Sequence, residues 1–274
     1  MKGVARREVR RLQGSALGAA QEDEVVAEEP LEIRAAGETM AITMRTPGAD
    51  RELAVGFLFA EGVIASRDDV GSVAHCGRPD QEGFGNTIDV RPGAGVSLDL
   101  DRLSATRRGT LTTAACGVCG RRSVDDVIGR CLPQTVAAAM IASETIANAT
   151  DSLKQLQPNF SRTGGIHAAA LLDARGEVMA AYEDIGRHNA LDKVVGKLVL
   201  EGRIPGKEAV LLVVSGRASF EVVQKASAAG IPIIASVSAA SSLAVDLARA
   251  AGITLCGFVR GGQMTVYAHA ERIR

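Results

Sequence analysis

The chain has 274 residues, 46% of them hydrophobic and 23% charged, which is the balance of a soluble globular protein. Its 31 Lys and Arg residues offset 32 Asp and Glu residues, and the net charge of -1 argues against nucleic acid or an anionic membrane as a partner. The absence of Trp and the 3% aromatic content disfavour a surface that stacks single-stranded bases. No apolar run approaches the ~20 residues of a transmembrane helix.

Residues 1–24 are predicted to form a flexible basic arm. Arg6, Arg7, Arg10 and Arg11 are followed by polar residues and not by an apolar segment. We therefore expect neither a Sec nor a twin-arginine signal peptide. We also expect the protein to stay in the cytoplasm, where thiols are kept reduced.

Residues 25–133 are predicted to form a β-rich N-terminal lobe. Apolar and polar residues alternate on either side of Gly37-Glu38, a pattern that predicts a β-hairpin. Asp50 is typical of a helix N-cap, because its short carboxylate can accept a hydrogen bond from the first helical turn. The predicted elements are strands over 31–35, 40–44 and 87–90 and a helix over 51–63.

Residues 134–274 are predicted to form an α/β lobe, so that the whole chain is of mixed α/β class. Short apolar runs alternate with helical segments, which predicts a parallel sheet covered by helices on both faces. The Ala-rich segment 134–156 is predicted to be a helix at the joint of the two lobes. The predicted strands are 166–173, 177–182, 209–214, 231–235, 253–259 and 264–268, and the predicted helices are 190–200, 219–229 and 241–251.

A Cys-x-x-Cys pair, Cys116 and Cys119, lies in the sequence TTAACGVCG. Two such cysteines can bind a metal, form a reversible disulfide or carry a transferable sulfur atom. Flanking arginines and a helix predicted after Gly120 favour thiolate over thiol, so we expect a lowered cysteine pKa. Gly117 and Gly120 indicate an exposed loop, which argues against these cysteines as packed core residues. The flanking arginines are Arg107, Arg108, Arg121 and Arg122.

Zinc binding and thioredoxin-like redox chemistry are alternative interpretations of this pair. A structural zinc site commonly takes its ligands from two such pairs, and the chain has a single pair. His75 and Cys76 are further candidate ligands, whereas Cys131 and Cys256 lie in apolar segments typical of core thiols. A thioredoxin-like pair follows an early strand of a βαβ unit, and this pair does not. A nucleophilic cysteine that takes up sulfur is therefore favoured.

Two turns are candidate phosphate-binding sites, although the chain has neither a P-loop nor a GxGxxG motif. Ser215, Gly216 and Arg217 follow an apolar strand and open a predicted helix, where backbone N–H groups and the helix dipole favour an anion. The sequence FVRGGQ, residues 258–263, follows another strand, and Arg260 can bind phosphate bidentately. Ordinary βα turns are the alternative, but two such turns at strand ends favour a nucleotide-like ligand.

A third polar cluster contains His167 and the sequence EDIGRHN, residues 183–189. Histidine, arginine and aspartate beside the start of a helix indicate a polar pocket. A zinc deaminase needs an H-x-E motif and a later P-C-x-x-C motif, and the lack of both excludes that chemistry. The alternative is structural, with His188 capping the helix and Arg187 pairing with Asp184.

These segments together resemble the FdhD family, the sulfur-carrier accessory proteins of formate dehydrogenase. The resemblance extends from about residue 25 to residue 270. It rests on the segments TMRTPGADRELAVGFLFAEGVI, CGVCG, RTGGIHAAAL, EDIGRHNALDKVVG, VVSGRAS and CGFVRGG. It implies a homodimer whose C-terminal lobe is similar to the cytidine deaminase fold without the deaminase zinc site.

The resemblance also implies a sulfurtransferase step in molybdenum-cofactor maturation. A cysteine desulfurase would pass sulfur to Cys116 as a persulfide, and Cys119 would assist or resolve it. The sulfur would then reach Mo-bis(molybdopterin guanine dinucleotide), a bound substrate, before its insertion into the formate dehydrogenase catalytic subunit. No tightly held metal of the protein's own is expected. The cofactor-binding segment implied by the resemblance comprises Phe258, Val259, Arg260, Gly261, Gly262 and Gln263. The alternative function is a zinc-binding or redox-sensing protein that uses the cysteine pair without sulfur transfer.

Overall fold

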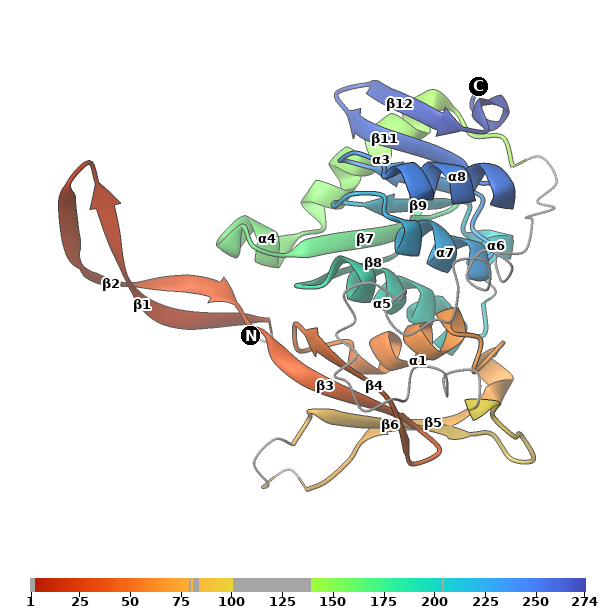
Figure 1. Cartoon of the computed structure of the whole chain (residues 1–274), viewed down its shortest axis with the longest axis horizontal. Coiled ribbons are helices and arrows are strands. Elements are labelled where there is room, and N and C mark those ends of the chain that lie inside the picture. Colours follow the sequence, from red (N-terminus) through yellow and green to blue (C-terminus); the bar gives the residue numbers. More distant parts are fainter. Residues whose placement is uncertain (1–2, 79, 81–83, 101–138, 204) are drawn as a thin grey trace.

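The structure is a computed structural model that describes residues 3–78, 80, 84–100, 139–203 and 205–274 (Figure 1). Within these residues the strands form a two-stranded hairpin, a four-stranded sheet and a six-stranded sheet. Helices α1 (Asp50–Ala60) and α5 (Arg187–Leu200) lie between the two larger sheets (Figure 1). The mixed α/β class is therefore confirmed, and the likeness to the cytidine deaminase fold stays a prediction.

The N-terminal residues form an antiparallel hairpin that projects from the body of the molecule (Figure 1). Strand β1 (Val4–Gln13) pairs with β2 (Ala16–Val26) around a turn at Gly14, where φ is 61°. The sequence predicts an arm here but no strands. Most side chains on both faces of the hairpin are exposed, so the alternation that marks a half-buried strand is missing.

The strands of the four-stranded sheet are β3 (Glu29–Ala35), β4 (Glu38–Arg45), β5 (Val70–His75) and β6 (Thr87–Pro92). Their order is β4-β3-β6-β5, and a 3-10 turn over Arg67–Asp69 precedes β5. β3 runs antiparallel to β4 and parallel to β6. This pairing confirms the predicted hairpin around Gly37 and the predicted strand over 87–90.

Helix α1 begins at Asp50, and Ala49 occupies its N-cap position in the left-handed conformation, with φ at 54°. The Asp50 carboxylate accepts hydrogen bonds from Nε and Nη2 of the buried Arg45, each at 3.1 Å. It also accepts one from Gly48 N at 3.2 Å. The prediction that Asp50 is the N-cap is therefore wrong, because its carboxylate compensates a buried guanidinium.

The strands of the six-stranded sheet are β7 (His167–Leu172), β8 (Val178–Asp184), β9 (Leu211–Val214), β10 (Ile233–Ser236), β11 (Thr254–Arg260) and β12 (Gln263–Ala268). Their order is β12-β11-β10-β9-β7-β8. The predicted strands are confirmed. The predicted parallel arrangement holds for β9, β10 and β11, whereas β7 and β12 run antiparallel to their neighbours. The β7–β8 and β11–β12 pairs are antiparallel because their connections are tight turns, which permit antiparallel pairing alone.

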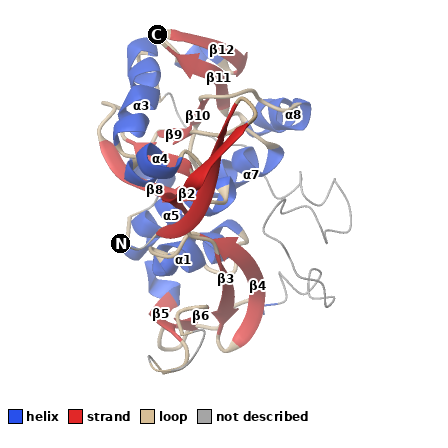
Figure 2. Ribbon diagram, turned by 90° about the vertical axis from the view of Figure 1, so that its left-hand side faces the viewer, coloured by secondary structure: helices blue, strands red, loops and turns tan. Residues whose placement is uncertain are grey.

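Helices cover both faces of this sheet, as predicted (Figure 2). Helices α5, α7 (Phe220–Ala228) and α8 (Ser242–Ala251) lie on one face, and α3 (Ser143–Gln155) lies on the other. α3 buries Ile146 and Leu153 in a cluster with Leu172 and Leu211, so it belongs to the sheet and is not the predicted joint between lobes. The shorter helical segments are α4 (Pro158–Thr163), α6 (Pro205–Glu208) and a 3-10 turn over Ala270–Arg272. None of the described helices is long and apolar enough to cross a membrane.

The crossing of α1 and α5 joins the N-terminal and C-terminal parts into one hydrophobic core. A Cβ atom built at Gly56 of α1 would lie 1.9 Å from the carbonyl oxygen of Asp192 in α5. One built at Gly196 of α5 would lie 1.9 Å from the carbonyl oxygen of Glu52 in α1. Glycine is therefore required at both positions, because any side chain would push the two helices apart.

Candidate functional site

The carboxyl ends of the parallel strands β9, β10 and β11 lie together at one end of the six-stranded sheet. We call this end of the strands the carboxyl edge of the sheet. The amino end of β7 and the carboxyl end of β8 lie at the same edge because β7 runs antiparallel to both β8 and β9. In Figure 1 this edge is on the left, beside α4. Ligands of open α/β sheets bind at such an edge. The fold thus brings together both predicted phosphate-binding turns and the predicted histidine cluster.

The turn after β9 is held against β7 by its own polar groups. Ala168 N donates a hydrogen bond to Ser215 Oγ at 2.9 Å, and Ser215 N donates to Ala168 O at 3.0 Å. Gly216 lies against His167, since a Cβ atom there would be 3.3 Å from the ring Nδ1. The Gly216 carbonyl accepts a hydrogen bond from Ser236 Oγ at 2.7 Å. The Ser215 hydroxyl oxygen is thus already an acceptor, and its proton remains available to a ligand.

Helix α7 begins at Phe220, so the prediction that residues 215–217 open a helix is wrong. Ser219 is the N-cap residue but makes no side-chain cap. Its Oγ instead lies 3.2 Å from Nε2 of His188, and Nδ1 of the same ring lies 2.9 Å from Oε2 of Glu221. The buried imidazole and carboxylate therefore orient a half-buried hydroxyl at this edge.

The structural alternative predicted for the histidine cluster is wrong in both of its contacts. Gly186 is the N-cap of α5, and His188 is the second residue of the helix, so it does not cap it. Asp184 is fully buried, and its Oδ2 lies 2.6 Å from Nζ of Lys193. Arg187 does not pair with Asp184, because a buried lysine from the next helical turns takes that carboxylate.

A histidine ring and a guanidinium flank Gly216. A Cβ atom built at this glycine would lie 3.3 Å from Nδ1 of His167 and 3.6 Å from Cδ of Arg187. Burial lowers the pKa of His167, and the charges of Arg187 and His188 lower it further against the attraction of Asp184. Nε of Arg187 is buried and has no hydrogen-bond partner among the described residues. The Arg187 guanidinium therefore has a hydrogen-bond donor, Nε, that a ligand at the carboxyl edge can use.

The segment 258–263 forms the end of β11 and the turn into β12. A β-bulge between Gly257 and Arg260, with φ of 52° at Phe258, turns the Phe258 ring outward, where 44% of the residue's surface is exposed. Phe258 N donates a hydrogen bond to Ser238 O at 3.0 Å, just beyond β10. A bulky residue in the left-handed region stores about 1–3 kcal/mol of strain, which is typical of functional positions.

The remaining residues of this segment differ in what they present to solvent. Val259 is fully buried in the core, so its side chain does not face the edge. Arg260 and Gln263 are exposed on either side of a two-residue turn. Gly261 and Gly262 form this turn with φ of 57° and 76°, values that such hairpin turns require. One aromatic ring and one guanidinium from the end of β11 are therefore available to a ligand.

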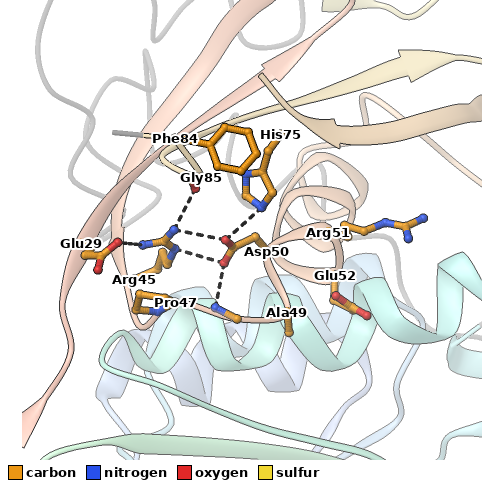
Figure 3. A pocket seen from close by; sticks show the side chains of 11 residues that line it. Glu29, Arg45, Pro47, Ala49, Asp50, Arg51, Glu52, His75, Phe84 and Gly85 are labelled. Carbon is orange, nitrogen blue, oxygen red and sulfur yellow. Dashed lines mark hydrogen bonds and ion pairs between the residues drawn. The ribbon is translucent and has the colours of Figure 1, made fainter. Parts of the chain in front are cut away.

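A polar cavity apart from this edge, with a volume of about 420 Å³, lies at the N-terminal end of α1 (Figure 3). At its centre Arg45 bonds to Asp50, and its Nη1 lies 3.3 Å from Oε2 of Glu29. Nε2 of His75 lies 3.4 Å from Asp50 Oδ2. The sequence does not predict this cluster, because its members come from three strands and a helix and share no motif. The lining carboxylates of Glu29, Asp50 and Glu52 outnumber the guanidinium groups of Arg45 and Arg51, so the cavity has no excess positive charge that would attract a phosphate group.

The predicted catalytic residues Cys116 and Cys119, with the arginines that flank them, lie in residues 101–138, outside the described residues. Cys131 also lies there. Cys256 is fully buried, and burial raises the pKa of its thiol to about 12, which confirms the predicted core thiol. In the part of the chain that the structure describes, no three His, Cys, Asp or Glu side chains are grouped to hold a metal ion. His75 and Cys76 thus have no third partner of this kind there.

The chain is similar to known proteins over nearly its whole length. The model of the FdhD/NarQ family matches residues 26–274. The sulfur carrier protein FdhD of Anaeromyxobacter dehalogenans is 56% identical over 261 residues, which cover 93% of this chain and 90% of that relative. The protein of the same name from Streptomyces avermitilis is 47% identical over 272 residues, covering 98% and 95%. A crystal structure from Desulfotalea psychrophila, described as a formate dehydrogenase accessory protein, has a TM-score of 0.77 at 23% identity and covers 99% of this chain and 100% of that chain.

Proposed function

Because the chain belongs to the FdhD/NarQ family, we propose that it is a sulfur carrier that serves the maturation of formate dehydrogenase. The names of relatives that match most of both chains support this role. The observation that carries the proposal is the meeting of both predicted phosphate-binding turns at the carboxyl edge of one sheet. A carrier that only exchanged sulfur between proteins would need no such edge, whereas one that acts on a nucleotide-bearing substrate does.

The proposed loading step is a transfer of sulfane sulfur between two cysteines. The Cys116 thiolate attacks the outer sulfur of a persulfide on a cysteine desulfurase, and the thiolate of the desulfurase leaves. One S–S bond breaks and another forms, so no external oxidant or reductant is needed. The cluster of flanking arginines supports this step, because nearby positive charge favours the thiolate, which is the attacking species.

The proposed release step uses the second cysteine. The Cys119 thiolate attacks the inner sulfur of the Cys116 persulfide, so that a Cys116–Cys119 disulfide forms and hydrosulfide leaves toward the substrate. The two cysteines supply the two electrons that reduce the sulfane sulfur to sulfide. A cellular dithiol then reduces the disulfide, which returns the carrier to its starting state.

The proposed substrate is Mo-bis(molybdopterin guanine dinucleotide), which offers guanine bases and phosphate groups to the carboxyl edge. The exposed ring of Phe258 provides a surface on which a base can stack. The exposed guanidinium groups of Arg217 and Arg260 can bind phosphate oxygens. The Ser215 hydroxyl adds a hydrogen-bond donor in the turn after β9. No metal resident in the protein takes part in this proposal.

We propose the cytoplasm as the place of action and a homodimer as the active form. A reducing compartment keeps Cys116 and Cys119 as thiols, which loading requires. The proposed partners are a cysteine desulfurase, which supplies sulfur, and the catalytic subunit of formate dehydrogenase, which receives the sulfurated substrate. A cytidine deaminase-like arrangement of the C-terminal lobe belongs to the same proposal.

Sulfur loading tests the proposal directly. The protein is incubated with a desulfurase and cysteine, and intact mass shows a gain of ~32 Da for one persulfide sulfur. Cys116→Ala should not gain this mass, whereas Cys256→Ser, a change at the buried thiol, should gain it like the wild type. A Cys116→Ala protein that still gains the sulfur at Cys119 and fully supports formate dehydrogenase activity contradicts the assignment. Purified protein that holds zinc and no cyanide-labile sulfur supports the metal-binding alternative instead.

A further inference from the structure

Two charged side chains of α5, Asp192 and Lys193, are buried with a partner of opposite charge, and a third, Arg187, is half-buried. Nζ of Lys193 lies 2.6 Å from Oδ2 of Asp184, and Oδ1 of Asp192 lies 2.7 Å from Nζ of Lys225. The third, Arg187, has no ion pair among the described residues, and its Nε is buried without an acceptor. A buried guanidinium N–H without an acceptor is costly unless a ligand or ordered water supplies one.

Resting on the proposed function, we propose that Arg187 and His167 form an anion pocket that binds a phosphate group of the nucleotide-bearing substrate. Both side chains lie against Gly216, which any larger residue would crowd into the His167 ring. Arg187 is also the first residue of α5, whose N-cap Gly186 makes no side-chain hydrogen bond. The positive end of the helix dipole therefore adds to the charge of the guanidinium.

The charges around His167 leave a positive balance for an anion to compensate. On β8, the Asp184 carboxylate is already paired with Lys193. On α5, Arg187 and His188 both oppose a positive charge on the ring. A phosphate beside the ring would remove this opposition and favour the imidazolium. Binding is therefore accompanied by uptake of a proton near neutral pH, close to the ordinary histidine pKa of ~6.5.

A phosphate fits this pocket better than a smaller or neutral group. The guanidinium fork binds two oxygens of one phosphate in a plane, which a point charge such as ammonium does not do. The histidine ring adds a third donor from β7 when it is protonated. Ser215, whose hydroxyl is a further donor, precedes Gly216 in the turn after β9. The pocket thus extends the phosphate site inward from the exposed Arg217 and Arg260.

Calorimetric titration of the full chain with inorganic pyrophosphate, GDP and guanosine tests the pocket. Arg187→Ala should weaken binding of pyrophosphate and GDP about tenfold or more, and leave guanosine binding unchanged. Arg187→Lys, which keeps the charge but loses the fork, should fall between Arg187→Ala and the wild type. Arg175→Ala is the matched control, because this exposed arginine lies in the β7–β8 turn at the opposite edge of the sheet.

Proton uptake distinguishes a binding role of His167 from a structural one. Pyrophosphate titrations in buffers of different ionisation enthalpy should show more proton uptake for the wild type than for His167→Gln, and the difference between the two proteins removes the ionisation of pyrophosphate itself. Equal proton uptake by the two proteins overturns the role of this ring. If Arg187→Ala does not fold, the pyrophosphate affinity of Arg187→Lys decides.

Different binding results would overturn the Arg187 pocket and the proposed function. GDP that binds the wild type and Arg187→Ala equally overturns the Arg187 pocket and leaves the nucleotide site at Phe258 and Arg260 standing. A wild type that binds neither GDP nor pyrophosphate overturns both the pocket and the nucleotide part of the proposed function. Sulfur loading at Cys116 is measured separately and reports on the carrier role alone.

Discussion

Replacing Gly56 by alanine should separate α1 from α5 and destabilise the whole body of the protein. The added Cβ atom would lie 1.9 Å from the carbonyl oxygen of Asp192, whereas a close C···O contact in proteins is about 3.3–3.6 Å. The obstacle is helix backbone and not the end of a flexible side chain. The two helices must therefore move apart by about 1.4 Å, the difference between the two distances.

Such a separation is large compared with the range of packing forces. A gap of about 0.5–1 Å already loses a quarter to a half of the contact attraction between facing atoms. Together with the strain of overpacking, the expected loss is about 3 kcal/mol or more in the free energy of unfolding. At roughly 2–4 °C for each kcal/mol in a chain of this size, the melting temperature falls by roughly 6–12 °C.

Thermal unfolding followed by circular dichroism measures this loss. Gly196→Ala should act in the same way, since its Cβ atom would lie 1.9 Å from the carbonyl oxygen of Glu52. Gly165→Ala is the control, because its Cβ atom would meet Val26 Cγ2 at an ordinary 3.5 Å. α5 also carries Arg187 to the carboxyl edge, so the Gly56 variant should bind pyrophosphate more weakly. A Gly56→Ala protein that melts with the wild type would show that the helices do not cross as described.

Three further predictions concern the cysteine pair, the exposed ring and a buried ion pair. The double variant Cys116→Ala, Cys119→Ala should lose sulfur loading and keep the melting temperature and the GDP affinity of the wild type. If the double variant instead loses zinc and unfolds, the cysteine pair is a structural metal site. Phe258→Ala should weaken GDP binding about tenfold, as loss of one base stack does, without changing pyrophosphate binding, and equal GDP affinity would contradict the stacking role. Asp192→Asn should lower the free energy of unfolding, measured with a chemical denaturant, by about 3 kcal/mol or more, because the buried Lys225 loses its carboxylate partner. Adding Lys225→Met should restore much of that loss. An Asp192→Asn protein as stable as the wild type would refute this account.

The sequence by itself determined most of the C-terminal elements of this protein. Short apolar runs such as 231–235 and 253–259, each bounded by glycine or polar residues, mark strands that are buried on both faces. The hairpin around Gly37 follows from alternation with a turn signal, and Cys256 was identifiable as a core thiol from its apolar neighbours. These features depend on residues close together in the chain, so local patterns suffice to find them. The hairpin β1–β2 escaped prediction because neither of its faces is buried.

Only the tertiary structure decided which polar groups meet. Ser219 reaches His188 across 31 positions of the chain because α5 packs against α7, and no local pattern records that packing. The partner of Asp184 is Lys193 and not the adjacent Arg187, since a buried ammonium requires the buried carboxylate more than a half-buried guanidinium does. Phe258 is exposed, although the β11 residues before it are buried on both faces, because β11 there runs past its pairing with β10 and departs from regular pairing with β12. Contacts of this kind depend on the relative placement of distant elements, which is set by the packing of the whole core.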